Sequence, residues 1–181
     1  MLTVITGGSK CGKSSIAEDI LYAASGEKIY IATMEPYCDD AIEAIERHHK
    51  MRLGKGFVTI EKYTDIHETA LPENCSVLLE CACNLLANET FSARAEKPVE
   101  KILFGIETLS GKAQNVIIVT GQVGEDGINY PKETMDYMRN MGMLNMKLAQ
   151  LAGNVIEAVY GIPVVIKGSM KSISGGMDNA F

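Results

Sequence analysis

The sequence lacks an excess of positive charge, a long apolar run and a paired-cysteine motif, and each absence excludes a class of protein. Seventeen basic against twenty-three acidic side chains give a net charge of −6, which argues against a nucleic-acid partner or an anionic membrane surface. No apolar run approaches the roughly twenty residues of a membrane helix, so no membrane span is expected. Residues 1–6 contain no basic segment, so a secretory signal is not expected either.

The cysteines point to a reducing environment. Five cysteines are an odd number, and no two of them form a Cys-x-x-Cys pair. The Cys81-x-Cys83 spacing does not fit a zinc knuckle. We therefore expect neither a disulfide framework nor structural zinc, and we expect a cytoplasmic protein.

Length and patterning predict one α/β domain. The 181 residues are 46% hydrophobic and 22% charged, as in a single globular domain, with no long linker. We expect a single domain over residues 1–168 and a flexible tail over 169–181. Strand-length apolar runs alternate with helix-type stretches, which predicts a mostly parallel sheet with helices on both faces. The predicted strands are Leu2–Thr6, Lys28–Thr33, Val77–Leu79, Val116–Thr120 and Val164–Ile166, with a further β segment at Phe57–Tyr63. The predicted helices are Lys13–Ala24, Asp39–Met51, and residues near 97–109 and 134–152.

A phosphate-binding loop stands directly after the first predicted strand. Residues 7–14 match the P-loop pattern G-x-x-x-x-G-K-[ST], in which backbone amides and the following helix N-terminus hold phosphates. Lys13 is placed to reach the β- and γ-phosphates, and Ser14 to ligate Mg²⁺. The fold class expected is therefore a P-loop NTPase-type (RecA-like) sheet. The predicted nucleotide-binding residues of the loop are Gly7, Gly8, Ser9, Lys10, Cys11, Gly12, Lys13 and Ser14.

Glu80 ends the apolar run Val77–Leu79. An acid at the carboxyl end of a buried parallel strand lies on the ligand side of the sheet, so Glu80 is predicted to hold Mg²⁺ or its water. The alternative is a strand-end acid that only faces solvent.

Two adjacent histidines lie near the end of the second predicted helix. Helical periodicity places His49 on the same helix face as the apolar Ile42 and turns His48 about 100° away from it. We therefore expect His49 to pack against the protein and His48 to project from it. A neutral imidazole attacks phosphorus, which makes His48 a candidate covalent nucleophile. Spacing alone favours another interpretation, a helix end whose cationic side chains complement the macrodipole.

The combination of these features resembles one known family over about residues 1–168. The family is the bifunctional adenosylcobinamide kinase/adenosylcobinamide-phosphate guanylyltransferases of cobalamin biosynthesis. The matching segments are the P-loop, Tyr30-Ile31-Ala32-Thr33, His48-His49-Lys50, Glu61, Leu78-Leu79-Glu80-Cys81, Val123-Gly124, Gly127-Ile128, Pro131, Arg139, Gly142, Asn145, Leu148-Ala149 and Gly161-x-Pro163.

The resemblance implies two reactions in a P-loop protein that is commonly a homotrimer. A nucleoside triphosphate (ATP or GTP) phosphorylates adenosylcobinamide, and GMP then passes from GTP through a GMP-histidine to adenosylcobinamide phosphate. The resemblance assigns the GMP to His48 and makes His48 and Lys13 catalytic. It also implies guanosine contacts at Thr33, Met34, Glu35, His49, Lys50, Met51, Arg52, Glu61 and Glu80.

The sequence also departs from the family pattern, and three departures remove a carboxylate. The family has Asn-Glu at Gly121-Gln122, Asp at Asn140, Gln at Met146 and Asp at Gly153. It also has Arg-Pro at Leu53-Gly54 and Trp at Phe57. Two alternatives therefore stay open: a small-molecule kinase without the transferase step, and a catalytically weak nucleotide-binding paralogue.

Overall fold

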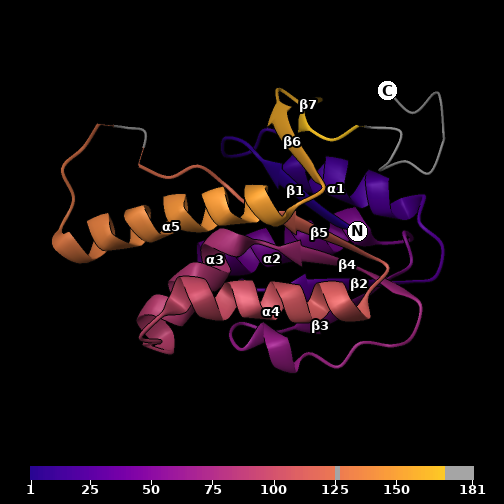
Figure 1. Cartoon of the computed structure of the whole chain (residues 1–181), viewed down its shortest axis with the longest axis horizontal. Helices are drawn as coiled ribbons and strands as arrows, with labels where there is room; N and C mark the ends of the chain where they lie inside the picture. The colour runs from indigo at the N-terminus through magenta and orange to yellow at the C-terminus, as the bar shows by residue number, and fades with distance from the viewer. Residues whose placement is uncertain (125–126, 170–181) are drawn as a thin grey trace.

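The computed structural model describes residues 1–124 and 127–169. Its strands are β1 (Leu2–Thr6), β2 (Glu27–Ala32), β3 (Phe57–Glu61), β4 (Cys75–Glu80), β5 (Asn115–Val119), β6 (Asn154–Val159) and β7 (Ile162–Lys167). Its α-helices are α1 (Lys13–Tyr22), α2 (Asp39–Arg52), α3 (Ala82–Ala87), α4 (Pro98–Lys112) and α5 (Lys132–Leu151), with a 3₁₀ turn η1 (Ile66–Glu68) and a π-helical turn η2 (Asn88–Ser92) (Figure 1). Among the described residues, none of the helices combines the length and apolarity needed to span a bilayer.

All seven strands join one sheet in the order β3-β2-β4-β5-β1-β6-β7. Every neighbouring pair is parallel except β6 and β7, which are antiparallel. The register places Glu61 beside Ala32, Ala32 beside Glu80, and Glu80 beside Val119. The carboxyl ends of β3, β2, β4 and β5 therefore align along one edge, which is where ligands of such sheets bind.

Helices cover both faces of the sheet because its central strands are apolar on both faces. All of β4 is buried, and its successive side chains point to opposite sides. Val77 and Leu79 belong to the apolar cluster that α3, α4 and α5 complete, while Leu78 joins the cluster of α1. This double coverage is the reason that the strands read as continuous apolar runs in the sequence.

The expected fold class is confirmed, and the differences concern short or edge elements. The predicted strands and helices all occur, with ends shifted by a few residues, and Phe57–Tyr63 contains the edge strand β3. The sequence analysis missed two elements. One is β6, because Asn154 and Glu157 interrupt its apolar run, and the other is the short helix α3. The expected tail falls almost wholly outside the described residues.

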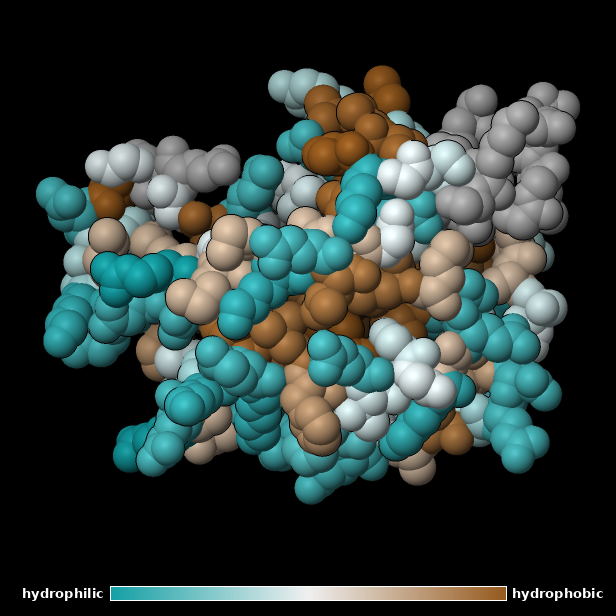
Figure 2. Space-filling model, viewed as in Figure 1, coloured by the Kyte–Doolittle hydropathy of each residue, from teal (hydrophilic) through white to brown (hydrophobic). Residues whose placement is uncertain are grey.

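The antiparallel strand β7 leaves an apolar face uncovered at the sheet edge. Ile162, Val164 and Ile166 alternate along β7 and are 64%, 45% and 60% exposed. Figure 2 shows hydrophobic side chains gathered over β6 and β7 at the top of the view.

The turn that enters the P-loop depends on Gly7, and we predict that Gly7→Ala destabilises the fold. Gly7 has φ +136°, and a Cβ there would lie 2.6 Å from the carbonyl oxygen of Ala158 in β6. We expect the free energy of unfolding in a denaturant titration to fall by about 1–3 kcal/mol. Gly8→Ala is the matched control, since a Cβ at Gly8 meets nothing within 4 Å, and its effect should stay within about 0.5 kcal/mol. Equal losses in the two variants would contradict this packing argument.

Candidate active site

The P-loop encloses the ammonium group of Lys13. Lys13 Nζ donates hydrogen bonds to the carbonyl oxygens of Gly7, at 2.9 Å, and of Gly8. The turn between β6 and β7 supports the loop from outside, because the N–H of Gly161 donates to the carbonyl oxygen of Cys11 at 2.9 Å. The loop is therefore anchored by an edge hairpin more than 140 residues later in the sequence.

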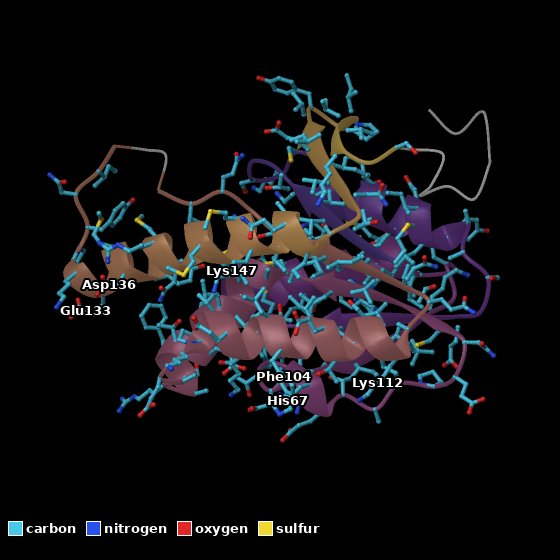
Figure 3. The ribbon with its side chains drawn as sticks, in the orientation of Figure 1. His67, Phe104, Lys112, Glu133, Asp136 and Lys147 are labelled. Atoms are coloured by element: carbon cyan, nitrogen blue, oxygen red, sulfur yellow. The ribbon has the colours of Figure 1, made fainter. Side chains whose placement is uncertain are left out.

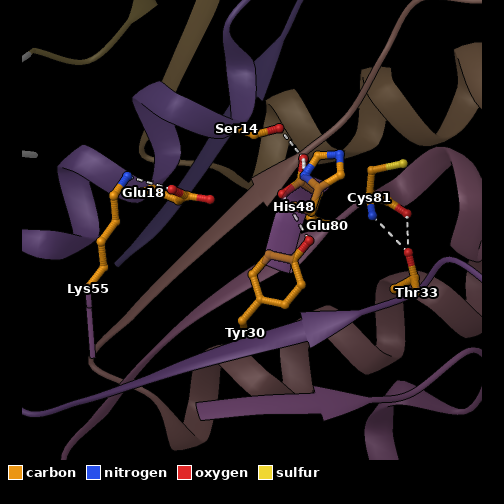
Figure 4. Close-up of polar contacts among 8 residues, drawn as sticks. All are labelled: Ser14, Glu18, Tyr30, Thr33, His48, Lys55, Glu80 and Cys81. Atoms are coloured by element: carbon orange, nitrogen blue, oxygen red, sulfur yellow. Dashed lines mark hydrogen bonds and ion pairs between the residues drawn. The ribbon is translucent and has the colours of Figure 1, made fainter. Parts of the chain in front are cut away.

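The carboxylate of Glu80 joins the P-loop helix to the middle of the sheet (Figure 4). One of its oxygens accepts a hydrogen bond from the Ser14 hydroxyl, and the other accepts one from the Tyr30 hydroxyl at 3.1 Å. Glu80 is only 8% exposed. Burial raises the pKa of Tyr30, and the neighbouring carboxylate raises it further, so the phenol stays protonated as a donor.

His48 faces this carboxylate, and the expectation that His48 projects while His49 packs is wrong. His48 Nδ1 lies 3.6 Å from Glu80 Oε1, too long for a hydrogen bond but within ion-pair distance. His49 is exposed, as is Ile42, with which it shares a stripe. The inner face of α2 carries Ala41 and His48, seven residues apart, because this helix covers the site edge rather than an apolar core.

Arg52 closes the same region from the end of α2. Its guanidinium carbon lies 3.4 Å from the centroid of the Tyr30 ring, a cation–π contact. Arg52 is 7% exposed, and its Nε and Nη1 have no hydrogen-bond partner among the described residues. A cavity of about 90 Å³ opens beside it, and its lining is Tyr30, Ala32, Met34, Ile45, His48, Arg52, Glu80, Cys81 and Asn84. Unpaired guanidinium donors next to a cavity favour an anionic or carbonyl-bearing ligand.

The structure separates the predicted guanosine contacts into an inner and an outer group. Met34 and Arg52 line the cavity with His48 and Glu80. By contrast, His49, Lys50 and Met51 are exposed on the outer surface of α2, where Lys50 pairs with Glu46 at 4.0 Å.

Thr33 and Glu61 lie at the same edge but in different settings. Thr33 is fully buried, and its hydroxyl accepts from the Cys81 N–H and donates to the Cys81 carbonyl, so its side chain is occupied by structure. Glu61 is exposed and accepts a hydrogen bond from the Tyr63 hydroxyl at 3.0 Å. Burial raises the pKa of Tyr63 most, and Glu61 raises it further. The Glu35 carboxylate makes a smaller contribution in the same direction. Two carboxylates, those of Glu61 and Glu35, therefore lie near the Tyr63 phenol.

The donor set at Ser14 and Glu80 fits a magnesium ion. A hydroxyl and a carboxylate are hard oxygen ligands of the kind that Mg²⁺ takes in P-loop sites, and they already contact each other. The carboxylate is nine-tenths buried, so its charge is weakly screened.

Comparison with known proteins identifies the family. The profile of the cobinamide kinase / cobinamide phosphate guanyltransferase family matches residues 3–166. The chain belongs to this family. It is 28% identical over 183 residues to the "Bifunctional adenosylcobalamin biosynthesis protein CobU" of Escherichia coli (strain K12), covering 92% of this chain and 100% of that protein. It is 30% identical, with the same coverage, to the protein of that name from Salmonella typhimurium (strain LT2).

A solved structure confirms the fold class. An ATPase from the type III secretion system of pathogenic bacteria superposes with a TM-score of 0.55 at 10% identity, covering 91% of this chain and 56% of that chain. At this identity the likeness shows only the P-loop ATPase fold.

One departure from the family pattern, at Gly121, fits the local packing. Gly121 follows β5, and a Cβ there would lie 3.2 Å from Cys83 Sγ. Asn145 of α5 holds this segment, since its amide donates to the Gly121 carbonyl at 2.9 Å and accepts from the Thr120 hydroxyl at 2.7 Å. The missing side chain at position 121 therefore makes room for the Cys83 thiol.

A second cluster of polar side chains lies outside this family site. Ligand atoms of Asp65, His67 and Glu68 all lie within 4.8 Å of one another. Lysines already neutralise the acids, because Lys101 lies 2.7 Å from Asp65 and Lys62 lies 2.9 Å from Glu68. His67 packs against Phe104 of α4 with ring centroids 5.5 Å apart (Figure 3), as expected of a structural histidine.

The sequence analysis assigned no chemical role to Cys83. We predict that the Cys83 thiol is reactive near neutral pH. A hydrogen bond from Cys81 lowers the Cys83 pKa to about 7, with smaller contributions from the Gly121 N–H, the Thr120 hydroxyl and the Lys13 charge. Since the thiolate is the nucleophile, alkylation of Cys83 by iodoacetamide should rise with pH and be half-maximal near pH 7.

The measurement is site-resolved mass spectrometry of the alkylated peptides at several pH values. Cys75 is the internal control, because it is fully buried and burial raises its pKa, so it should stay unlabelled in the folded protein. Labelling of Cys83 that begins only in the range of an ordinary thiol would contradict the prediction.

Proposed function

We propose that this chain is an enzyme that phosphorylates adenosylcobinamide and then transfers GMP to the product through His48. The observation that carries the proposal is the meeting of the P-loop helix and α2 at one carboxylate, Glu80. Ser14 and His48, 34 residues apart in sequence, both approach the same Glu80 oxygen. A kinase without a covalent step has no need for a histidine beside its phosphate cradle, so this juxtaposition favours the two-step activity.

In the first reaction, the hydroxyl of adenosylcobinamide attacks the γ-phosphorus of a nucleoside triphosphate. The bond between the γ-phosphorus and the bridging oxygen breaks, and the hydroxyl proton leaves as the phosphate ester forms. Loop amides and the Lys13 ammonium neutralise the charge that develops on the phosphate oxygens. Lys13 now donates to the loop carbonyls and would turn to the phosphates of a bound nucleotide.

In the second reaction, an imidazole nitrogen of His48 attacks the α-phosphorus of GTP and pyrophosphate leaves. A proton on Nδ1, which faces the Glu80 carboxylate, leaves the Nε2 lone pair free for this attack. A phosphate oxygen of adenosylcobinamide phosphate then attacks the same phosphorus and breaks the P–N bond. The products are free histidine and adenosylcobinamide-GDP.

Ser14 and Glu80 would hold Mg²⁺ at the phosphates in both steps. The ion supplies positive charge for the phosphate oxygens. The unpaired donors of Arg52, with Met34, Glu35 and Glu61, are proposed to contact the guanosine, because a carboxylate such as Glu61 complements the N–H donors of guanine.

The assembly and location of the enzyme are also proposals. All seven strands lie in one sheet, which supports a single domain over residues 1–168. The uncovered apolar face of Ile162, Val164 and Ile166 on β7 supports self-association, and we propose the homotrimer that the family resemblance implies. All five cysteines are free thiols, which supports the reducing cytoplasm expected from the sequence.

Replacing Lys13 by Ala tests the phosphate cradle. Both reactions need the ammonium at the phosphates, so each rate should fall by about 10²–10³-fold. The measurements are γ-phosphate transfer to adenosylcobinamide and protein labelling from α-labelled GTP with magnesium. Parental GTP binding and turnover in Lys13→Ala would place the nucleotide site elsewhere.

Replacing His48 by Asn tests the covalent step. His48→Asn should abolish the acid-labile GMP adduct and the transferase while leaving the kinase rate within about twofold. His49→Asn is the matched control, since His49 is exposed on the outer surface of α2, and it should keep the adduct.

The outcomes of the His48 experiment separate the alternatives. Label on His49 instead would show that the assignment is off by one residue. Kinase activity without any adduct in the parent would favour the small-molecule kinase, and the absence of both reactions with GTP still bound would favour the nucleotide-binding paralogue.

A further inference from the structure

The helix that carries His48 has little attachment to the rest of the protein. Of the fourteen residues of α2, only Ala41 near its start and Arg52 at its end are buried. An amphipathic helix is ordinarily held by an apolar face buried in the core, but Ala44 and Ile45 on the inner side of α2 are only half-buried. The place of His48 relative to the P-loop therefore depends on a few specific contacts near the end of the helix.

One of those contacts is an ion pair to the P-loop helix itself. Lys55 follows α2 by three residues, and its Nζ lies 2.6 Å from Glu18 Oε2 (Figure 4). Glu18 lies on α1, four residues after Ser14, and its side chain is wholly buried. The N–H of Lys55 donates to the carbonyl of Arg52 at 3.1 Å, so Lys55 is tied to the last turn of α2.

The Glu18 carboxylate depends strongly on this single cation. Among the described residues, Lys55 is the only cation within ion-pair distance of Glu18, and Glu18 Oε1 has no hydrogen-bond partner. A buried carboxylate is unfavourable unless it is paired, so the pair strongly favours the position of Lys55 seen here. Lys55 also lies 3.7 Å from Asp19, but that carboxylate is half exposed and contributes little.

We infer that the Lys55–Glu18 ion pair positions His48 for attack on the nucleotide by fixing the end of α2 to the P-loop helix. The inference rests on the proposed function, since it concerns the guanylylation step. The pair links the helix that begins at the P-loop to the segment directly after the helix that carries the nucleophile. A displacement of about 1 Å at a reacting atom lowers a rate by about 100-fold, so loss of the pair should slow the His48 step. The kinase step uses no residue of α2 as a nucleophile and should not depend on the pair.

The test is the single-turnover rate of GMP-His48 formation in Lys55→Met, with the kinase rate measured on the same preparation. We expect the adduct rate at saturating GTP to fall by about 10- to 100-fold, with the kinase rate within about twofold of the parent. Lys55→Arg keeps a cation and should retain most of the adduct rate. Asp19→Asn, which removes the exposed partner of Lys55, is the matched control and should match the parent.

The double variant Lys55→Met/Glu18→Gln separates positioning from stability. It removes the unpaired buried charge that Lys55→Met leaves, so its thermal unfolding midpoint should recover toward the parent while its adduct rate stays low. An adduct rate that recovers with the midpoint would overturn the inference, as would an undiminished rate in Lys55→Met or a parallel loss of the kinase. Absence of the adduct in the parent would instead refute the proposed function, and the inference with it.

Discussion

The buried carboxylate of Glu80 is the group on which the organisation of the site depends. It ends the central strand β4 and receives a hydroxyl from the P-loop helix, a phenol from β2 and the imidazole of α2. A carboxylate that is 8% exposed needs such partners, because an unpaired buried charge is strongly unfavourable. The same need that stabilises Glu80 brings three separate elements to one point.

The charges around Glu80 suit a site that handles phosphates. Lys13 lies in the loop next to Ser14, and the Arg52 guanidinium is stacked on the ring of Tyr30, the phenol that Glu80 binds. Each of these two cations adjoins a residue that hydrogen-bonds Glu80, so the region offers positive charge to an anionic ligand. Neither cation is neutralised by a close carboxylate of its own among the described ion pairs, which leaves their charge available.

The two faces of the sheet differ in how firmly their helices are held, and the difference agrees with the chemistry. α4 and α5 pack buried apolar side chains on one face, and α1 does so on the other. α2 also lies over the face that α1 covers, but polar and aromatic contacts hold it there. Elements that must admit and release a ligand belong to the less stable parts of a fold. A cavity of about 90 Å³, lined by Ile45, His48 and Arg52 of α2, lies at this less firmly held helix.

The sequence by itself determined the sheet, the P-loop and the acid at the end of β4. These are local features: strand-length apolar runs, a loop whose residue spacing is fixed by phosphate geometry, and a polar residue directly after a buried strand. The tertiary structure decided which histidine faces the site, because helical periodicity identifies a stripe but does not say whether that stripe meets a core or a cavity. It also decided that His49, Lys50 and Met51 are exposed on α2, and that the Thr33 hydroxyl is occupied by the Cys81 backbone. The hydrogen bond from Gly161 to the P-loop residue Cys11 joins residues 150 positions apart, and the Lys55–Glu18 pair joins residues 37 positions apart. Only the folded chain brings such distant residues within hydrogen-bond distance.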